Sequence, residues 1–198
     1  MSQTPAAAAS QRQMTTRTLA YCSMLAALQV ILARLIIPMP AADTRFSLEA
    51  IPVVLAGLLF GPVPGAMVGF GSDLVGCLFS GYGYNPLFCV PPILYGLCGG
   101  FFRYYVNHKP NFLRVLLTYV PPVVLGSILW QSFTLAYVYN SQGTFLQSLY
   151  LMLISRSIQF VIVGTLEALV TYFLLKSGIF KALKVWPLAK NKRKEEVL

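Results

Sequence analysis

The stretch "RFSLEAIPVVLAGLLFGPVPGAMVGFGSDLVG", residues 45–76, decides the fold. It begins with Arg45 and Glu49, becomes apolar, is interrupted at "FGPVPG", and then carries Asp73 within a second apolar run. Proline and glycine disfavour a continuous helix at the interruption. The stretch therefore predicts two apolar helices joined by a turn, with charged side chains kept near one end of the pair.

The chain as a whole has the composition of an integral membrane protein. Of its 198 residues, 57% are hydrophobic and 11% are charged, whereas soluble domains carry about 25% charged residues. A soluble chain of this composition would expose too much apolar surface. We expect residues 1–14 to be disordered, residues 15–178 to form the membrane domain, and residues 179–198 to form a basic cytoplasmic tail.

The apolar segments predict an all-α bundle of six transmembrane helices. A helix needs about 20 apolar residues to cross the hydrocarbon core of a bilayer. The second segment is too short for this and is expected to be tilted or partly buried. The six predicted spans cover residues 16–37, 47–60, 63–80, 86–106, 112–139 and 149–175.

The basic residues predict the orientation of the bundle. Six spans place both termini on the same side of the membrane, and Lys and Arg accumulate in cytoplasmic flanks. The two terminal flanks and the loop between the fourth and fifth spans hold most of the 15 basic residues. Both termini are therefore expected to be cytoplasmic. The net charge of +9 reflects this topology and contact with lipid headgroups, and it gives no support to a nucleic-acid partner.

Three arginines are predicted to lie in the outer half, against the trend of the other basic residues. Arg34 ends the first span, Arg45 lies in the first outer loop, and Arg156 lies inside the sixth span. An arginine within a span costs at least ~2.5 kcal/mol on insertion scales. These residues indicate either an anionic ligand or pairing with outer acids. Arg45 and Glu49 are one helical turn apart and could simply pair, and Arg34 could extend to the headgroups.

Asp73 is the most informative acid. It lies about 10 Å inside the outer end of the third span, at 1.5 Å per residue. A buried carboxylate needs a partner, which is either an arginine of this chain or the N–H/NH₂ edge of a planar heterocycle. Glu167 lies deeper in the sixth span and is expected to be structural or to pair across helices.

Aromatic and amide side chains gather at the same outer level. Tyr82, Tyr84 and Asn85 belong to "SGYGYNP", and Gln131 lies in the outer third of the fifth span. Most aromatic residues at this level are expected to belong to the interfacial belt. Tyr82 and Tyr84 differ because the neighbouring glycines allow their loop to fold over a cavity.

Small residues recur at four-residue spacing in two regions. Gly57, Gly61, Gly65 and Gly69 form one series and Gly96 and Gly100 another, a spacing that permits close approach of helix backbones. These series predict intramolecular packing. Ser23 and Ala27 form a further small pair on the first span, which could pack inside the bundle or against a partner subunit.

The sequence contains no pattern that predicts an enzyme active site, a cofactor or a metal site. His108 is the sole histidine, so neither an intramembrane metalloprotease nor a Ser–His protease is expected. The four cysteines lie in apolar segments without CxxC spacing and are expected to be small core residues. The chain has no P-loop motif, so a partner must supply any ATP-driven step. A structural or channel protein remains an alternative.

"IPVVLAGLLFGPVPGAMVGFGSDLVG", followed by "GYGYNP" and "LYGLCGG", resembles the S components of energy-coupling factor (ECF) vitamin transporters, most closely the folate-specific group. The resemblance covers residues 16–176. It implies a six-helix subunit in the prokaryotic plasma membrane that holds one vitamin in a pocket open to the outside. It also implies assembly with a transmembrane coupling subunit and two cytoplasmic ATPases. Pantothenate, a queuosine precursor or riboflavin are alternative substrates.

The resemblance also implies roles for the outer residues. Asp73 accepts hydrogen bonds from the pterin edge of folate, and Tyr82, Tyr84 or Phe46 covers the faces of the ring. Charge-assisted hydrogen bonds to the carboxylates or to the pterin oxygen would come from Arg34, Arg45 and Arg156. The amides of Gln131 and Asn85 are weaker candidates for contacting the ligand. Ser23 and Ala27 match the small-residue motif that contacts the coupling subunit, although the family usually has alanine at both positions.

Overall fold

The computed structural model describes residues 16–34, 37–38, 45–79, 85–108, 111–138, 145–177 and 179–182. These parts of the chain are almost entirely helical. Their helices are α1 (Thr16–Arg34), α2 (Ala50–Phe60), α3 (Pro62–Leu78), α4 (Val90–Phe101), α5 (Arg103–His108), α6 (Phe112–Pro122), α7 (Gln131–Val138), α8 (Phe145–Lys176) and α9 (Ile179–Ala182). A 3₁₀ helix, η2 (Pro86–Cys89), and a π-helix, η3 (Val123–Trp130), join them, and two-residue strands β1 (Ile37–Pro38) and β2 (Arg45–Phe46) pair antiparallel.

The all-α prediction is confirmed, and each predicted span corresponds to one helical stretch. The fourth span consists of η2, α4 and α5, and the fifth consists of α6, η3 and α7. Within the described ranges, three helices are long and apolar enough to cross a membrane by themselves, at Thr16–Arg34, Phe112–Val138 and Met152–Lys176. The predicted disordered segment lies outside the described residues, as does most of the predicted tail.

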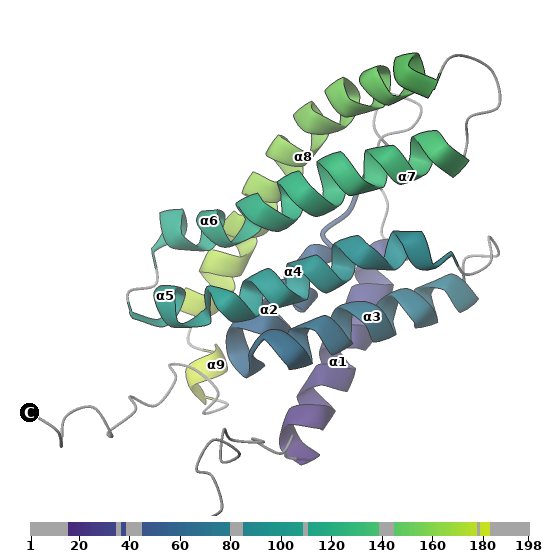
Figure 1. The fold of residues 1–198 in the computed structure, drawn as a ribbon. Helices are drawn as coiled ribbons and strands as arrows, with labels where there is room; N and C mark the ends of the chain where they lie inside the picture. The colour runs from purple at the N-terminus through teal and green to yellow at the C-terminus, as the bar shows by residue number, and fades with distance from the viewer. Residues whose placement is uncertain are drawn as a thin grey trace, which may run out of the picture.

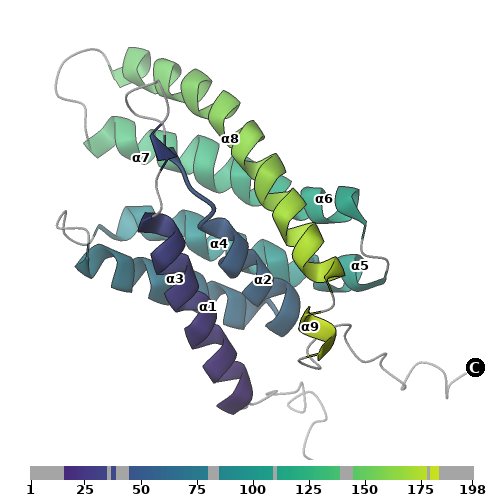
Figure 2. The ribbon, with the colours of Figure 1, turned by 180° about the vertical axis from the view of Figure 1, so that it is seen from behind.

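The helices form two layers. In Figure 1, α2, α3 and α4 lie in one layer with α1 across it, while α8 and the rod of α6 and α7 form the other. The junction of α2 with α3, the start of α6 and the end of α8 lie at the same end of the molecule. The start of α1 and helix α9 also lie near one another when the molecule is seen from behind (Figure 2). The described ends of the chain are therefore on the same side, as six spans require.

Helix α2 is the buried centre of the bundle. All ten residues from Ala50 to Leu59 are buried, and α2 packs against α1, α3, α4 and α8. With 11 residues it is ~16 Å long at 1.5 Å per residue, which is too short to cross a bilayer. A helix that is apolar on every face is stable only when it is surrounded. The segment was expected to be tilted or partly buried, and the structure buries it over nearly its whole length.

Glycines bring the backbones of α2, α3 and α4 into direct contact. A Cβ atom added at Gly65 would lie 2.5 Å from the carbonyl oxygen of Gly96 and 2.7 Å from the Cα of Gly57. A Cβ at Gly99 would lie 2.6 Å from the carbonyl oxygen of Val54. Real side-chain atoms do not approach backbone this closely, so only glycine fits. The prediction that the glycine series serves packing within the molecule is confirmed.

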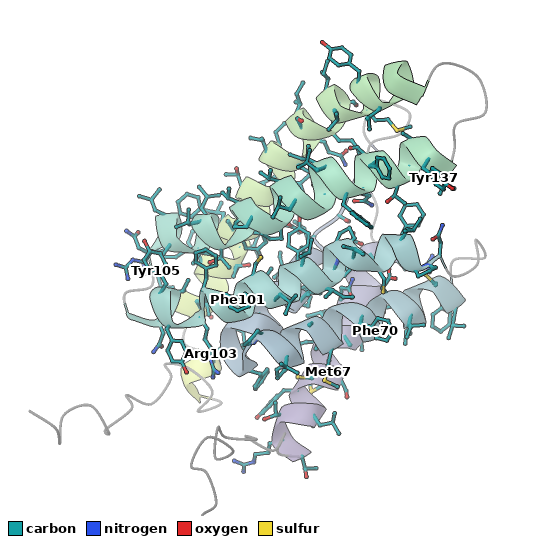
Figure 3. The ribbon with its side chains drawn as sticks, viewed as in Figure 1. Met67, Phe70, Phe101, Arg103, Tyr105 and Tyr137 are labelled. Carbon is teal, nitrogen blue, oxygen red and sulfur yellow. The ribbon has the colours of Figure 1, made fainter. Side chains whose placement is uncertain are left out.

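The turn between α2 and α3 is held by an arginine. Gly61 has a φ of 113°, a conformation that favours glycine, and Pro62 begins α3. The guanidinium of Arg103 donates from Nη2 to the carbonyl oxygen of Leu59 at 2.6 Å. It thereby satisfies a carbonyl in the last turn of α2. Figure 3 shows Arg103 at the same end of the molecule as the exposed Phe101.

The fifth span changes its helix type in the middle. Pro121 and Pro122 end α6, and a π-helix follows them directly. Proline lacks the N–H group that an α-helix requires and its ring displaces the preceding turn, so a wider turn is accommodated there. Short π segments of this kind are frequent at functional sites.

Exposed aromatic residues mark both ends of the bundle. Tyr105 and Tyr137 are 45% and 69% exposed, and Figure 3 shows them at opposite ends of the molecule. Tyrosine is enriched at both membrane–water interfaces. Between these ends, Met67 and Phe70 of α3 are also exposed. The apolar side surface with tyrosines at either end agrees with a membrane-spanning orientation.

The glycine contact predicts that Gly65→Ala is strongly destabilising. The added methyl group meets backbone atoms that cannot move aside, and overpacking of this kind costs roughly 1–3 kcal/mol. The matched control is Gly71→Ala on the same helix, where an added Cβ meets nothing within 4 Å. Thermal unfolding in detergent is expected to show a lower Tm for Gly65→Ala and an unchanged or higher Tm for Gly71→Ala. Equal values of Tm would contradict the packing role.

Candidate functional site

A cavity of about 310 Å³ lies toward the end of the bundle that the basic residues predict to face outward. Residues of α1, α2, α3, α4, α7 and α8 surround it together with η2 and η3. Its lining combines apolar walls with many polar groups, an unusual concentration for the interior of a membrane protein. The polar lining includes Gln29, Arg34, Glu49, Ser72, Asp73, Tyr95, Ser127, Gln131 and Glu167.

Two buried acceptor oxygens in this cavity lack hydrogen-bond partners. Oδ2 of Asp73 and Oε1 of Gln29 are buried and form no hydrogen bond within the described parts of the chain. The thiol of Cys89 hydrogen-bonds the Asp73 carboxylate, which leaves acceptor capacity on that group. An unsatisfied buried acceptor costs about 1–3 kcal/mol. The cavity is therefore suited to a ligand that brings N–H or O–H donors.

Arg34 lies at the rim of the cavity and connects two helix ends. It is the last residue of α1, and its Nη2 donates to the carbonyl oxygen of Gly76 in α3 at 2.7 Å. A guanidinium carries five N–H donors, so further donors remain for a ligand. Arg34 is exposed and lines the cavity, which gives the site a cation at its edge.

Glu167 has a structural partner, as the sequence predicted. It is 3% exposed, and its Oε1 accepts a hydrogen bond from the backbone N–H of Ala50 at 3.2 Å. Ala50 is the first residue of α2, so its N–H has no partner within that helix. The acceptor oxygen thus lies at the positive end of the helix dipole. Glu167 thus ties α8 to the start of α2 while it lines the cavity.

The inner wall of the cavity is shaped by hydroxyl groups that already have partners. Tyr95 Oη and Ser127 Oγ are 3.0 Å apart in a hydrogen bond between α4 and η3. Ser72 Oγ donates to the carbonyl oxygen of Val68 at 2.6 Å. The first of these hydrogen bonds joins α4 to η3, whereas the second lies within α3. Among the described residues of the lining, the buried side-chain atoms without a hydrogen bond are Asp73 Oδ2 and Gln29 Oε1.

The 3₁₀ helix at the rim is anchored from two directions. Trp130 Nε1 donates to the carbonyl oxygen of Leu87 at 2.8 Å. Oδ1 of Asn85 accepts a hydrogen bond from the Leu87 N–H at 3.1 Å, which makes Asn85 the cap of η2. Asn85 is not among the residues that line the cavity. Its observed role is to hold the turn that carries Cys89, and its ligand role stays a prediction.

The cavity brings together three of the predicted site residues, Arg34, Asp73 and Gln131. Arg156 is not part of the lining, and its guanidinium carbon lies 5.4 Å from the centre of the Phe160 ring. Arg45 and Phe46 lie in β2, where they pair with Pro38 and Ile37. The side chains of both, and the whole of Tyr82 and Tyr84, lie outside the described residues.

Gln29 is the cavity residue that sequence reasoning missed. It is 6% exposed and lies in an apolar part of α1, between Leu28 and Val30. That position was a usable signal, because a polar side chain within a membrane span usually faces a cavity or the bundle interior. Tyr95 and Ser127 were also missed, since hydroxyl groups within apolar segments are common and carry little information.

A second, apolar groove of about 570 Å³ runs between α1 and α3. Ser23 and Ala27, the predicted partner-facing pair, both line it. Ser23 Oγ donates to the carbonyl oxygen of Leu19 at 3.0 Å, so its hydroxyl is satisfied and the residue offers a small surface. Val30 and Ser72 line both the groove and the polar cavity. Only a thin wall of α1 and α3 therefore separates the two.

Comparison with known proteins identifies the same architecture elsewhere. A family model described as "ECF-type riboflavin transporter, S component" matches residues 13–176. The crystal structure of FolT bound with folic acid has a TM-score of 0.67 and 27% sequence identity, and the match covers 80% of this chain and 94% of that chain. The S-component for biotin from an ECF-type ABC transporter has a TM-score of 0.57 at 20% identity, covering 85% and 95% of the two chains.

The curated relatives match a smaller part of the chain. A UPF0397 protein of Streptococcus pneumoniae strain CGSP14 is 28% identical over 108 residues, which cover 53% of this chain and 59% of that protein. A UPF0397 protein of strain P1031 matches to the same extent. The chain thus spans little more than half the length of these relatives. The likeness to the biotin-binding structure concerns the fold alone.

The contact between Glu167 and Ala50 predicts different outcomes for two substitutions. Glu167→Leu leaves the Ala50 N–H without an acceptor and is expected to lower the free energy of unfolding by about 1–3 kcal/mol. Glu167→Gln keeps an acceptor oxygen of similar shape and serves as the matched control, with a smaller loss. Unfolding in detergent, followed by circular dichroism, measures both. A leucine variant as stable as the glutamine variant would show that this hydrogen bond does not hold α2.

Proposed function

The chain belongs to the ECF-type riboflavin transporter S-component family, and from that premise we propose that it captures folate outside the cell for an ATP-driven importer. It is a membrane protein of the vitamin-transporter class. The polar cavity bears on the identity of the substrate, and the groove between α1 and α3 bears on the identity of the partner.

The observation that carries the folate proposal is the pair of unsatisfied acceptors in one cavity. Asp73 Oδ2 and Gln29 Oε1 both require donors. The pterin of folate presents adjacent N–H and NH₂ donors on one edge, and a carboxylate can accept both. Such bonds are charge-assisted and therefore strong. The desolvation cost of Asp73 is offset when this edge is bound.

The dimensions and charges of the cavity agree with a ligand that enters ring first. A cavity of about 310 Å³ is near the lower end of ligand pockets, which span roughly 300–1,000 Å³. It can enclose the pterin while the benzoyl-glutamate tail extends toward the rim. Arg34 lies at that rim and can pair with a tail carboxylate. Arg45 and Arg156 stay candidates for the second carboxylate, and Tyr82, Tyr84 and Phe46 for covering the ring.

Riboflavin is the second candidate substrate, because the matching family is described by that vitamin. Its isoalloxazine ring offers a single ring N–H between two carbonyl oxygens. That edge supplies one donor and two acceptors to a cavity whose unsatisfied groups, Asp73 Oδ2 and Gln29 Oε1, are acceptors. The hydroxyl groups of the ribityl chain could provide other donors. Folate satisfies the two acceptors more directly, so it is the preferred assignment.

The proposed energy source is a separate module. The chain has no P-loop, so ATP must be hydrolysed by partner subunits. We assign the groove lined by Ser23 and Ala27 to a transmembrane coupling subunit, which in turn would bind two cytoplasmic ATPases. Small residues allow the helix of a partner to approach α1 closely.

The substrate proposal predicts folate binding that depends on Asp73. Isothermal titration of the protein in detergent is expected to show tight binding of folate and weaker binding of riboflavin and biotin. Asp73→Asn replaces one acceptor by a donor and is expected to weaken folate binding by about 10-fold or more, equivalent to at least 1.4 kcal/mol.

The matched control for Asp73→Asn is Leu74→Ala, one residue further along α3. Leu74 is 37% exposed and does not line the cavity, so folate affinity is expected to be unchanged. Preferential binding of riboflavin by the wild-type protein would make riboflavin, and not folate, the proposed substrate. An unchanged folate affinity in Asp73→Asn would reduce Asp73 to a structural residue.

The partner proposal predicts that Ala27→Trp prevents assembly with the coupling subunit without affecting folate binding. The indole fills the groove that the partner helix would occupy. Leu28→Trp is the matched control, because Leu28 is 44% exposed on the same helix and does not line the groove. Co-purification of the coupling module with each variant measures assembly. Recovery of the module with Ala27→Trp at the level of the control would rule out this interface.

A further inference from the structure

Gln29 is a buried amide at the cavity wall whose side-chain oxygen has no hydrogen bond to the described parts of the chain. Its side chain is 6% exposed. A buried amide in a membrane helix is expected to be paired, because an unsatisfied polar group in hydrocarbon is costly. It lines the same cavity as Asp73. The cavity therefore presents one unsatisfied acceptor from α1 and another from α3.

The other polar groups of the lining show how unusual this pair is. Ser72 donates to the carbonyl oxygen of Val68, Tyr95 bonds Ser127, and Glu167 accepts from Ala50. Each of these contacts is internal and structural. Gln29 and Asp73 lie on α1 and α3, which pack against each other. A ligand group placed at this wall could reach both acceptors.

The 2-amino group of a pterin carries two N–H bonds that point in different directions. One lies beside the ring N3–H, and a carboxylate can accept both of these. The other lies beside the ring nitrogen N1, which is an acceptor. A carboxamide can accept from this second N–H and donate to N1 at the same time, which is the pairing by which Asn and Gln recognise the N6/N7 edge of adenine. Asp73 and Gln29 thus provide the two kinds of group that the two sides of a 2-aminopterin require.

We propose that Gln29 is a specificity-determining residue whose Oε1 accepts a hydrogen bond from the 2-amino group of the bound pterin, on the side opposite to Asp73. This rests on the proposed function, because it takes folate as the ligand. It adds that the site distinguishes 2-aminopteridines from pteridines and flavins with a carbonyl oxygen at the equivalent ring position. Such a carbonyl would place an acceptor against two acceptors, and sites built to bond a donor reject ligands that lack it.

The test compares two ligands on two forms of the protein. The probes are folate and its 2-desamino analogue, which differs only in lacking the 2-amino group. The variant is Gln29→Met, which keeps the length of the side chain but removes the strong acceptor. Gln159→Met is the matched control, because Gln159 is also 6% exposed but does not line the cavity. Both dissociation constants are measured on the same preparation, so incomplete folding does not affect their ratio.

The expected result is a larger loss for one of the two ligands. Gln29→Met removes the donor to N1 for both ligands but the acceptor for the 2-amino group only for folate, so it is expected to weaken folate binding roughly 10-fold more than binding of the 2-desamino analogue, the effect of one lost hydrogen bond at a buried group. Gln159→Met is expected to keep the wild-type ratio. Where Gln29→Met fails to fold, Gln29→Glu retains an acceptor oxygen and is expected to keep the preference for folate.

Four other results overturn the inference, and they differ in what else they affect. Equal weakening of both ligands by Gln29→Met shows that Gln29 supports the fold and does not read the 2-amino group. Unchanged folate binding in Gln29→Met shows that Gln29 does not contact the 2-amino group. Loss of the preference for folate over the 2-desamino analogue in Gln29→Glu shows the same. A wild-type protein that fails to bind folate overturns the folate assignment and this inference together, whereas the first three results leave that assignment intact.

Discussion

Close contact between the backbones of α2, α3 and α4 is the constraint on which the rest of the structure depends. Gly57, Gly65 and Gly96 meet without side chains between them, and this contact lets an 11-residue helix be surrounded at the centre of the bundle. Direct backbone contact is the means of association that remains to helices in a membrane, where lipid is as apolar as their side chains. The contact also fixes the rotation of α3 about its axis.

The polar cavity begins where the close backbone packing of α3 against α4 ends. Gly69 still meets the backbone of Pro92, but one helical turn further along α3 Asp73 faces the cavity beside η2. The 3₁₀ helix, held by Asn85 and Trp130, carries Cys89 to the Asp73 carboxylate. The π-helix after the two prolines contributes Ser127 to the opposite wall. Tight packing at one end of the bundle and interrupted helices at the other thus create a rigid scaffold with a polar opening.

The sequence predicted the elements better than it predicted their contacts. Hydrophobic segments and proline breaks were sufficient for six helical stretches and for a buried α2, and the depth of Asp73 indicated a site. Gln29 was missed because the rotation of α1 against α3 decides whether its side chain meets the cavity or lipid, and local sequence does not determine that rotation. Asn85 was expected near a ligand, yet the structure uses it as a helix cap, a role for which asparagine is equally suited. The π-helix could not be anticipated either, since prolines inside a span more often only kink it.

The central claim is that Asp73 and Gln29 bind the donor groups of a pterin within the outer cavity. A structure of the protein determined with folate bound tests this most directly, because it locates the ring and its hydrogen bonds at once. The account predicts that the pterin lies in the cavity, with N–H groups at hydrogen-bond distance from Asp73 Oδ2 and Gln29 Oε1 and the glutamate toward Arg34. A pterin placed elsewhere, or one that turns a carbonyl edge toward these two oxygens, would contradict it.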